Sequence, residues 1–418
     1  MKLFRIENFP TYIRIYFRGK RIFSHHKRIS VSFVEDNYAR TIKHLRDRLG
    51  KQVIRVGFLV NELAKWQYQS LYEELEQSPW FEPVVLVTKM DKELAHYKSL
   101  QECYAFFAGL GLRTELAYNS ERGFLPLSDF DIDILFYQQP WFVHSSQSPI
   151  SVSQYALTCY MGYGILLVKY LDMYTHRFHK YLWTMFVSSS MFIREFEQLM
   201  GKAVTNCKEV SYVKLDNYLL PAPPTVHIKK IIIYAPHHSF EDNSLRCALF
   251  QHTGRAVLEM AKSLREDIHW IFKPHPRFRH AVIKNKILTE EEVNDYYNDW
   301  SQLGEIYEGG DYIDKFRQSF ALITDCVSFL GEYLPSGNPV FHLVNNPSIF
   351  NELGQEIISA YYQVDAASLE KVFRQVVIEG DDFLREKRLA KIPLLFRGDE
   401  RASSKILHFL EEAICESV

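Results

Sequence analysis

The stretch Ile231–Ser239 (IIIYAPHHS) shows the pattern around which this 418-residue chain is organised. Its run of β-branched residues predicts a buried strand of a parallel sheet, and the proline ends that strand. Two imidazoles and a hydroxyl then stand at the carboxyl end of the strand: His237, His238 and Ser239. Polar groups placed directly after a buried strand recur twice further along the chain.

The second and third copies of this arrangement lie within the next hundred residues. Trp270–Arg279 (WIFKPHPRFR) predicts another buried strand stopped by proline, with His275 between two prolines and three cations close by, Lys273, Arg277 and Arg279. In Ala321–Glu332 (ALITDCVSFLGE) the strand ends at Asp325 and a helix opens near Ser328. Ligands of open α/β sheets bind beyond the carboxyl ends of the strands, where helix amino termini present N–H groups to anions. The three strand ends therefore predict a nucleotide or phosphate site.

These stretches, in this order, resemble the CDP-glycerol glycerophosphotransferases, the teichoic-acid and capsule polymerases with a two-domain glycosyltransferase-B fold. The resemblance covers about residues 225–380 and is only topological before them. A His-Pro pair after a strand also resembles bacterial sialyltransferases. The matching segments are Tyr234–Pro236, Lys273–Pro276, Leu322–Phe329, Glu332–Tyr333 and Gly337–Val340. The resemblance implies an α/β fold of two Rossmann-like, doubly wound domains that face each other across a cleft.

The same resemblance implies a function. The enzyme would move glycerol phosphate, or a related alditol phosphate, from a CDP-activated donor to a hydroxyl of a glycan or lipid-linked polymer, releasing CMP in cell-surface or capsule polysaccharide biosynthesis. Such chemistry needs neutralised phosphate charge and a base on the acceptor hydroxyl. We predict that His275 and its neighbouring cations bind the donor phosphates. The full set of predicted donor-binding residues is Lys273, Arg277, Asp325, Ser328 and Gly310.

The general base is predicted from a second region of the resemblance, in the first half of the chain. The resemblance implies that the turn Thr158–Gly164 corresponds to a Trp-His-Gly-Thr-Pro turn of the family, whose His is the base. When Gly162 is aligned with the glycine of that turn, Met161 stands where the His would be. We therefore predict His237 or His238 as the base, because an imidazole titrates near neutral pH. Asp325 either caps the following helix or accepts hydrogen bonds from a ligand hydroxyl. We predict no cofactor and no metal, since no carboxylate cluster of the metal-binding kind is visible.

Two other readings remain open. One is a glycosyltransferase that uses a CMP-activated sugar such as sialic acid, with a carboxylic acid or base from the first domain; the candidates are Asp129, Asp131 and Asp133. The other is a non-catalytic subunit that binds a nucleotide within a capsule assembly. The presence of Met161 in place of the expected His favours this second reading somewhat.

The first half of the chain also alternates strands with helices, which predicts a doubly wound parallel sheet. It begins with a strand over Val53–Val60 and a helix over Gln67–Gln77. The turn between them, Asn61–Trp66, lacks the glycine spacing of a dinucleotide fingerprint, which argues against NAD. The predicted domains are residues 1–50 (a basic, aromatic arm and a helix), 51–215 (acceptor side), 216–225 (linker) and 226–418 (nucleotide side). Fold analogy suggests that the final helix, over Ala402–Ile414, crosses back to the first domain.

Composition restricts the cellular setting. The content of 47% hydrophobic and 24% charged residues is that of a globular protein with ample core. The six cysteines are scattered, which gives neither a zinc-finger spacing nor a disulfide framework and favours a reducing cytosol. The amino terminus lacks the apolar core of a signal peptide. Gln138–Val168, which contains no Asp, Glu, Lys or Arg, is a poor membrane span. We predict a cytoplasmic protein.

Charge is unevenly distributed. Residues 1–30 carry a net charge of +7 with interleaved aromatic residues, so the rest of the chain carries -9. An acidic body does not indicate nucleic-acid binding. The arm is predicted either to lie on an anionic membrane surface at the inner face of the membrane, or to be a solvated arm or a helix packed on the body.

Overall fold

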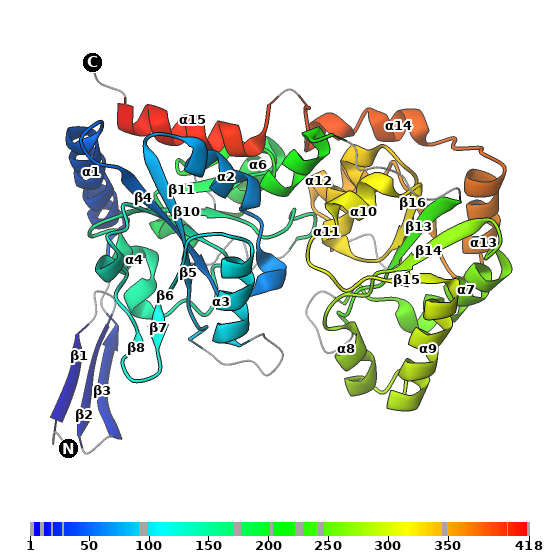
Figure 1. Ribbon diagram of the computed structural model, residues 1–418, viewed down its shortest axis with the longest axis horizontal. Helices are drawn as coiled ribbons and strands as arrows, with labels where there is room; N and C mark the ends of the chain where they lie inside the picture. The colour runs from blue at the N-terminus through cyan, green and yellow to red at the C-terminus, as the bar shows by residue number, and fades with distance from the viewer. Residues whose placement is uncertain are drawn as a thin grey trace.

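The computed structural model contains two parallel α/β sheets, each flanked by helices, with a small antiparallel sheet at the amino-terminal end (Figure 1). This is the predicted fold class, two Rossmann-like domains of the glycosyltransferase-B type. The residues that the structure describes are 4–8, 12–17, 20–26, 29–91, 99–169, 177–200, 204–221, 229–240, 246–344, 349–398 and 400–415.

The first domain is built on a seven-stranded parallel sheet in the order β12-β11-β10-β9-β4-β5-β6. Its central strands β4 and β9 are almost entirely buried, which explains their continuous apolar sequences. The strands are β4 (Ile54–Val60), β5 (Phe81–Val87), β6 (Thr114–Leu116), β9 (Ile134–Tyr137), β10 (Leu157–Met161), β11 (Thr184–Val187) and β12 (Cys207–Glu209). A short hairpin joins β7 (Tyr118–Asn119) to β8 (Gly123–Phe124).

Helices and short 3₁₀ turns connect these strands. The α-helices are α1 (Val31–Arg48), α2 (Gln69–Gln77), α3 (Leu100–Gly109), α4 (Pro149–Val152) and α6 (Ser190–Met200). The 3₁₀ turns are η1 (Leu63–Lys65), η2 (Leu127–Phe130), η3 (Ser145–Gln147), η4 (His179–Tyr181) and η5 (Val213–Leu219).

The second domain has a six-stranded parallel sheet in the order β15-β14-β13-β16-β17-β18. Its strands are β13 (Lys230–Ala235), β14 (Ile268–Phe272), β15 (Gly304–Ile306), β16 (Ala321–Thr324), β17 (Val340–Leu343) and β18 (Tyr362–Val364). Its helices are α7 (Phe250–Ser263), α8 (Phe278–Lys284), α9 (Glu290–Leu303), α10 (Ile313–Gln318), α11 (Val327–Glu332), α12 (Glu352–Ile358), α13 (Leu369–Phe373) and α14 (Arg385–Leu389), with 3₁₀ turns η6 (Leu334–Ser336) and η9 (Ile392–Leu394) and a π-helical turn at Arg374–Ile378. Stacked aromatic side chains fill one face of this sheet; Phe272 and Trp300 lie with ring centroids 5.1 Å apart.

The final helix, α15 (Ala402–Cys415), packs on the first domain, as predicted by fold analogy. Figure 1 shows it lying along α1 and α2, far from α13 and α14, which precede it in sequence. Its apolar face is fully buried at Ile406 and Leu410. The guanidinium of Arg46 on α1 donates to the carbonyl of Ala413 near its end, at 2.9 and 3.1 Å. The chain therefore crosses between the domains twice, which couples their relative positions.

Three sequence-based predictions are corrected. Residues 1–30 form, where described, a three-stranded antiparallel sheet of β1 (Phe4–Asn8), β2 (Tyr12–Phe17) and β3 (Lys20–His26), not a solvated arm or a helix. The alternation of residue types in YIRIYF has the two-residue period of a strand. The membrane role of this segment stays a prediction.

The predicted linker and the predicted glycine turn also differ. Asp216 at the start of the supposed linker is buried in η5, and the following residues are described only as far as Pro221. Thr158 to Met161 are strand β10, so the turn begins only at Gly162. The uncharged apolar sequence there reflects a strand buried between two neighbours. Among the described residues no helix combines the length and the apolar character needed to cross a membrane.

Candidate functional site

The three strand ends singled out in the sequence meet at one edge of the second sheet. Strands β14, β13 and β16 are adjacent and parallel, so their carboxyl ends lie side by side. This brings three imidazoles together: the ring centroids of His238 and His275 are 3.8 Å apart, and those of His237 and His275 are 5.0 Å apart. One ring nitrogen from each of the three lies within 4.8 Å of the others. The predicted convergence of His237, His238 and His275 is thus present in the structure.

Asp325 organises the loops that carry these histidines. Its carboxylate accepts a hydrogen bond from the backbone N–H of His237 at 2.6 Å and another from that of Leu249, just before α7, at 2.7 Å. The side chain is 2% exposed. Burial raises the pKa of this carboxyl to about 6, although both hydrogen bonds act in the opposite direction. Asp325 therefore joins the loop after β13 to the start of α7, and it does not cap α11.

We infer where two of the imidazoles carry their protons from the hydrogen bonds of Nδ1. Nδ1 of His237 accepts from the backbone N–H of Ser239 at 3.2 Å and lies 2.8 Å from the hydroxyl of the same residue, which can donate to it. Nδ1 of His275 accepts from the backbone N–H of Arg277 at 3.1 Å. Burial, followed by the neighbouring imidazole of His238, lowers the pKa of both histidines well below 6.5, so both are neutral. A neutral imidazole whose Nδ1 is an acceptor carries its proton on Nε2. Each ring therefore offers one Nε2–H donor.

This assignment decides what the cluster can bind. A cation would need the Nε2 lone pairs, and the Nδ1 protons would then face the backbone N–H groups of Ser239 and Arg277. An anion needs donors, which both rings already present. The cluster thus suits a phosphate better than a metal ion. The same tautomer makes His237 a donor, which does not favour its predicted role as a base.

Lys273 lies in an aromatic enclosure beside this cluster. Its ammonium donates to the carbonyl of Gly309 at 3.1 Å and lies 4.7 Å from the ring centroid of Tyr312. The Lys214 ammonium, from η5 of the first domain, lies 4.7 Å from the same centroid. Burial, with a further contribution from Lys214, lowers the pKa of Lys273 to about 8. The Lys273 ammonium, at the end of β14, is almost fully buried and gives one N–H to Gly309. Its other N–H groups can still donate to an anion.

The other predicted donor-binding residues are placed as follows. Gly310 is exposed in the loop after β15, with open space where a side chain would stand. Ser328 faces the first domain, because a Cβ atom added to Gly164 would lie 3.4 Å from the Cβ of Ser328. Arg279 is turned away: its guanidinium donates to Asn294 on α9. Arg279 is therefore removed from the candidate site.

The first-domain side of the site was missed by the sequence reasoning. The turn after β4 carries Glu62 and Lys65. Burial raises the pKa of Glu62 and lowers the pKa of Lys65 to about 8, and Arg277 of the second domain makes a smaller contribution to lowering both pKa values. The ammonium of Lys65 donates to Gln139 and lies 5.0 Å from the ring centroid of Tyr163. Two charged residues directly after a buried strand could have marked this turn as part of a site. The sequence analysis considered only that the turn lacks the glycine spacing of a dinucleotide fingerprint.

The other first-domain candidates do not reach this side. Met161 is buried at the end of β10, where its backbone N–H donates to the hydroxyl of Tyr68 at 3.0 Å. Asp133 pairs with Arg48 at 2.6 Å and precedes β9, at the amino edge of the sheet. Asp129 and Asp131 are in the same loop region before β9. These three carboxylates thus lie at the opposite edge of the first sheet from Gly164, which follows β10 and comes close to Ser328 of the second domain, and their use as an acid or base stays a prediction.

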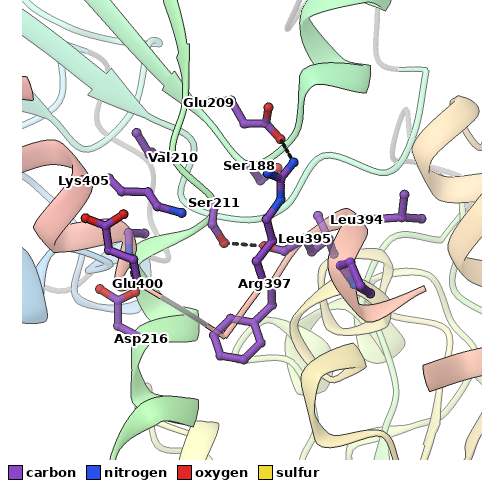
Figure 2. Close-up of a pocket in the computed structure, with 13 residues that line it drawn as sticks. Ser188, Glu209, Val210, Ser211, Asp216, Leu394, Leu395, Arg397, Glu400 and Lys405 are labelled. Carbon is purple, nitrogen blue, oxygen red and sulfur yellow. Dashed lines mark hydrogen bonds and ion pairs between the residues drawn. The ribbon is translucent and has the colours of Figure 1, made fainter. Parts of the chain in front are cut away.

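A separate pocket of about 130 Å³ lies where the chain returns to the first domain (Figure 2). Its walls come from the carboxyl ends of β11 and β12 and from the segment before and within α15. Arg397 pairs with Glu209 across it at 3.9 Å, and the Ser211 hydroxyl donates to the carbonyl of Leu395. Its lining includes none of the predicted site residues. We interpret these contacts as part of the junction between the domains.

Comparison with solved structures supports the fold. A putative UDP-N-acetylglucosamine 2-epimerase from Listeria monocytogenes matches with 15% identity and a TM-score of 0.57, over 88% of this chain and 98% of that one. The UDP-GlcNAc 2-epimerase from Neisseria meningitidis bound to UDP-GlcNAc has 13% identity and a TM-score of 0.56, over 86% and 100%. The wall teichoic acid polymerase TagF has 14% identity and a TM-score of 0.56, over 93% and 99%. No family model matches the sequence, and the search of curated proteins gives no match.

Proposed function

We propose that this chain transfers glycerol phosphate, or a related alditol phosphate, from a CDP-activated donor to a hydroxyl of a glycan or polymer, releasing CMP. The observation that carries the proposal is the pair of neutral imidazoles, His237 and His275, whose Nε2–H groups stand at the carboxyl edge of the second sheet. The ordered motifs shared with the CDP-glycerol glycerophosphotransferases and the fold similarity to TagF support it.

The chemistry requires little more than positioning and charge. The acceptor oxygen attacks the β-phosphorus, its bond to phosphorus forms as the bond to the CMP oxygen breaks, and the acceptor proton passes to a base. Donors held rigidly beside the phosphates stabilise the developing charge. In this proposal the two imidazole N–H groups, Arg277 and the ammonium of Lys273 have this role. No covalent enzyme intermediate is needed.

We expect His275→Ala to weaken CMP binding by about 10- to 100-fold, because a hydrogen bond to a charged group contributes roughly 1.5–3 kcal/mol. Isothermal titration with CMP measures the change. His252→Ala, an exposed position on α7, is the matched control and should bind as the unmodified protein does. Equal affinities for the two variants would remove His275 from the nucleotide site.

The reaction is tested by incubating the protein with CDP-glycerol, CDP-ribitol, CMP-sialic acid and UDP-N-acetylglucosamine, each with a hydroxyl-bearing acceptor. Release of CMP from a CDP-alditol, with a phosphodiester on the acceptor, is the expected result. Release of CMP from CMP-sialic acid would instead support the sugar transferase. Binding of CMP without turnover of any donor would support the non-catalytic subunit, the reading favoured by the buried Met161.

A further inference from the structure

A small cavity lies at the carboxyl edge of the first sheet, where three adjacent strands end. Asn61 follows β4, Thr88 follows β5 and Gln139 comes just after β9, and all three residues line the cavity. Its volume of about 10 Å³ is roughly that needed to hold one water molecule or one hydroxyl group. Gly164, which follows β10 at the same edge, comes close to Ser328 of the second domain. The cavity thus lies on an edge of the first sheet that meets the second domain, a usual place for a ligand of an α/β sheet.

Asn61 leaves a hydrogen-bond acceptor unused beside this cavity. Oδ1 of its side chain is buried, and within the described residues no donor is bonded to it. The other polar walls are engaged: the Thr88 hydroxyl donates to Oε1 of Gln147 at 2.9 Å, and Nε2 of Gln139 donates to the carbonyl of Trp141 at 3.0 Å. A buried acceptor without a donor is costly, so a group that fills the cavity should bring a donor to Asn61.

The backbone of Asn61 is held in place by the first domain itself. Oε1 of Gln138 accepts from the backbone N–H groups of Asn61 at 3.0 Å and of Glu62 at 3.1 Å. Gln138 is only 1% exposed, so this turn is anchored to the core of the sheet. A ligand that bonds to the Asn61 side chain therefore does not have to order the turn that carries it, which favours binding.

An aromatic side chain forms part of the same cavity wall. Phe142 lines the cavity and is 39% exposed. Its backbone has φ +56°, a conformation uncommon for an aromatic residue, and its carbonyl accepts from the backbone N–H of Asp91 at 2.8 Å. The ring of the preceding residue, Trp141, lies 6.4 Å from that of Tyr163, which follows β10. Aromatic rings beside a few fixed polar groups suit a ligand with an apolar face and hydroxyls at its rim, which is the character of a sugar ring.

We propose that this cavity is a subsite for the acceptor and that it takes a sugar ring. One hydroxyl of the sugar enters the cavity and donates to Oδ1 of Asn61, while Phe142 packs against the apolar face of the ring. The proposal rests on the proposed transfer reaction, and it makes the acceptor a glycan rather than a chain of alditol phosphates, because a phosphodiester has no donor for Oδ1. The two sheets are then complementary: the second presents N–H donors to a phosphate, and the first presents an acceptor to a hydroxyl.

The test measures sugar binding in the absence of any donor. The probes are lactose, maltose and diacetylchitobiose, with glycerol 3-phosphate as an anionic polyol, and saturation-transfer NMR and calorimetric titration give the Kd. We expect the unmodified protein to bind at least one disaccharide. Asn61→Ala should weaken this binding about three- to tenfold, the loss of one neutral hydrogen bond. Asn61→Asp keeps an acceptor oxygen and should recover most of the lost affinity, which a loss caused by altered folding would not do.

The aromatic contact has its own variant and control. Phe142→Gly removes the ring and tolerates the positive φ, so the fold is kept while the disaccharide binds more weakly. Phe106→Ala and Gln101→Ala, at exposed positions of α3 in the same domain, are the matched controls for the ring and for the amide. Both controls should bind the disaccharide as the unmodified protein does.

Three results would overturn the sugar subsite. They are no binding of any disaccharide by the unmodified protein, which would mean that the cavity holds only water; binding that is equal in the unmodified protein, Asn61→Ala and Phe142→Gly; and an equal loss in Asn61→Ala and Asn61→Asp. Binding of glycerol 3-phosphate alone would also contradict it and favour a polyol phosphate acceptor. Disaccharide binding that follows the expected order without turnover of any donor would overturn the proposed reaction and leave the subsite standing.

Discussion

Replacement of Asp325 by alanine is expected to lower the melting temperature by on the order of 10 °C and to abolish detectable CMP binding. The substitution leaves two buried backbone N–H groups, of His237 and Leu249, without their acceptor. Each unsatisfied buried group costs about 1–3 kcal/mol of unfolding free energy, and 1 kcal/mol corresponds to about 2–4 °C for a domain of this size. The loop after β13 also loses the contact that orients His237.

Asp325→Asn gives a second, pH-dependent result. The pKa of the carboxyl rises from 3.8 to about 6 on folding, so the unfolded chain releases its proton at lower pH than the native protein. Native stability contributed by this group is therefore fully present below pH 4 and declines as pH rises to 6, by about 3 kcal/mol for a shift of this size. The melting temperature of the unmodified protein should rise relative to Asp325→Asn when the pH falls from 7 to 4.

Differential scanning fluorimetry at pH 4, 5, 6 and 7 measures both effects. Asp295→Ala, at an exposed position of α9, is the control and should change the melting temperature by little at any pH. A difference between the unmodified protein and Asp325→Asn that is constant over this range would show that the carboxyl does not change its pKa on folding.

The imidazole cluster could be predicted from the sequence because each of its strand ends is marked by a short local pattern. A β-branched run followed by proline predicts where each strand ends, and parallel strands place these ends at one edge whatever their order. The order β14-β13-β16 itself was not predicted, although it is what brings His275 next to His237.

The surroundings of Lys273 and of the turn that carries Glu62 depend on contacts that no local sequence pattern contains. Lys273 was predicted as a phosphate ligand from its place after a strand, yet its enclosure by Tyr312 is created by a segment some forty residues later. The turn that carries Glu62 is held by the amide of Gln138, which directly follows β9. These contacts join residues far apart in the sequence, so they can be recognised only in the folded protein.

The hydrogen bonds that hold the start of α15 on the first domain give the second large effect. Asp216 of η5 receives three hydrogen bonds at the start of α15: from the backbone N–H groups of Ala402 at 2.7 Å and Ser403 at 2.9 Å, and from the Ser403 hydroxyl at 2.6 Å. It is 2% exposed, and burial raises its pKa. Asp216 is thus an N-cap supplied from a distant part of the chain.

We expect Asp216→Ala to cost about 3–5 kcal/mol of unfolding free energy, since it removes a helix cap and leaves buried donors unsatisfied. The melting temperature should fall by roughly 10 °C, and a protease should cut near residue 401 much faster than in the unmodified protein. Asp295→Ala again serves as the control, and Asp216→Asn, which keeps one acceptor oxygen, should give an intermediate loss. Unchanged melting and cleavage in Asp216→Ala would show that packing of Ile406 and Leu410 alone holds the helix.

A functional consequence follows from where α15 lies. It is the segment that returns from the second domain to α1 and α2 of the first, so its release loosens the relation between the two domains without a change at His275. Below its melting temperature, Asp216→Ala should therefore bind CMP with nearly unchanged affinity, because the nucleotide contacts come from the second domain. Its kcat should fall, because in the proposed reaction an acceptor held by the first domain must meet a phosphate held by the second.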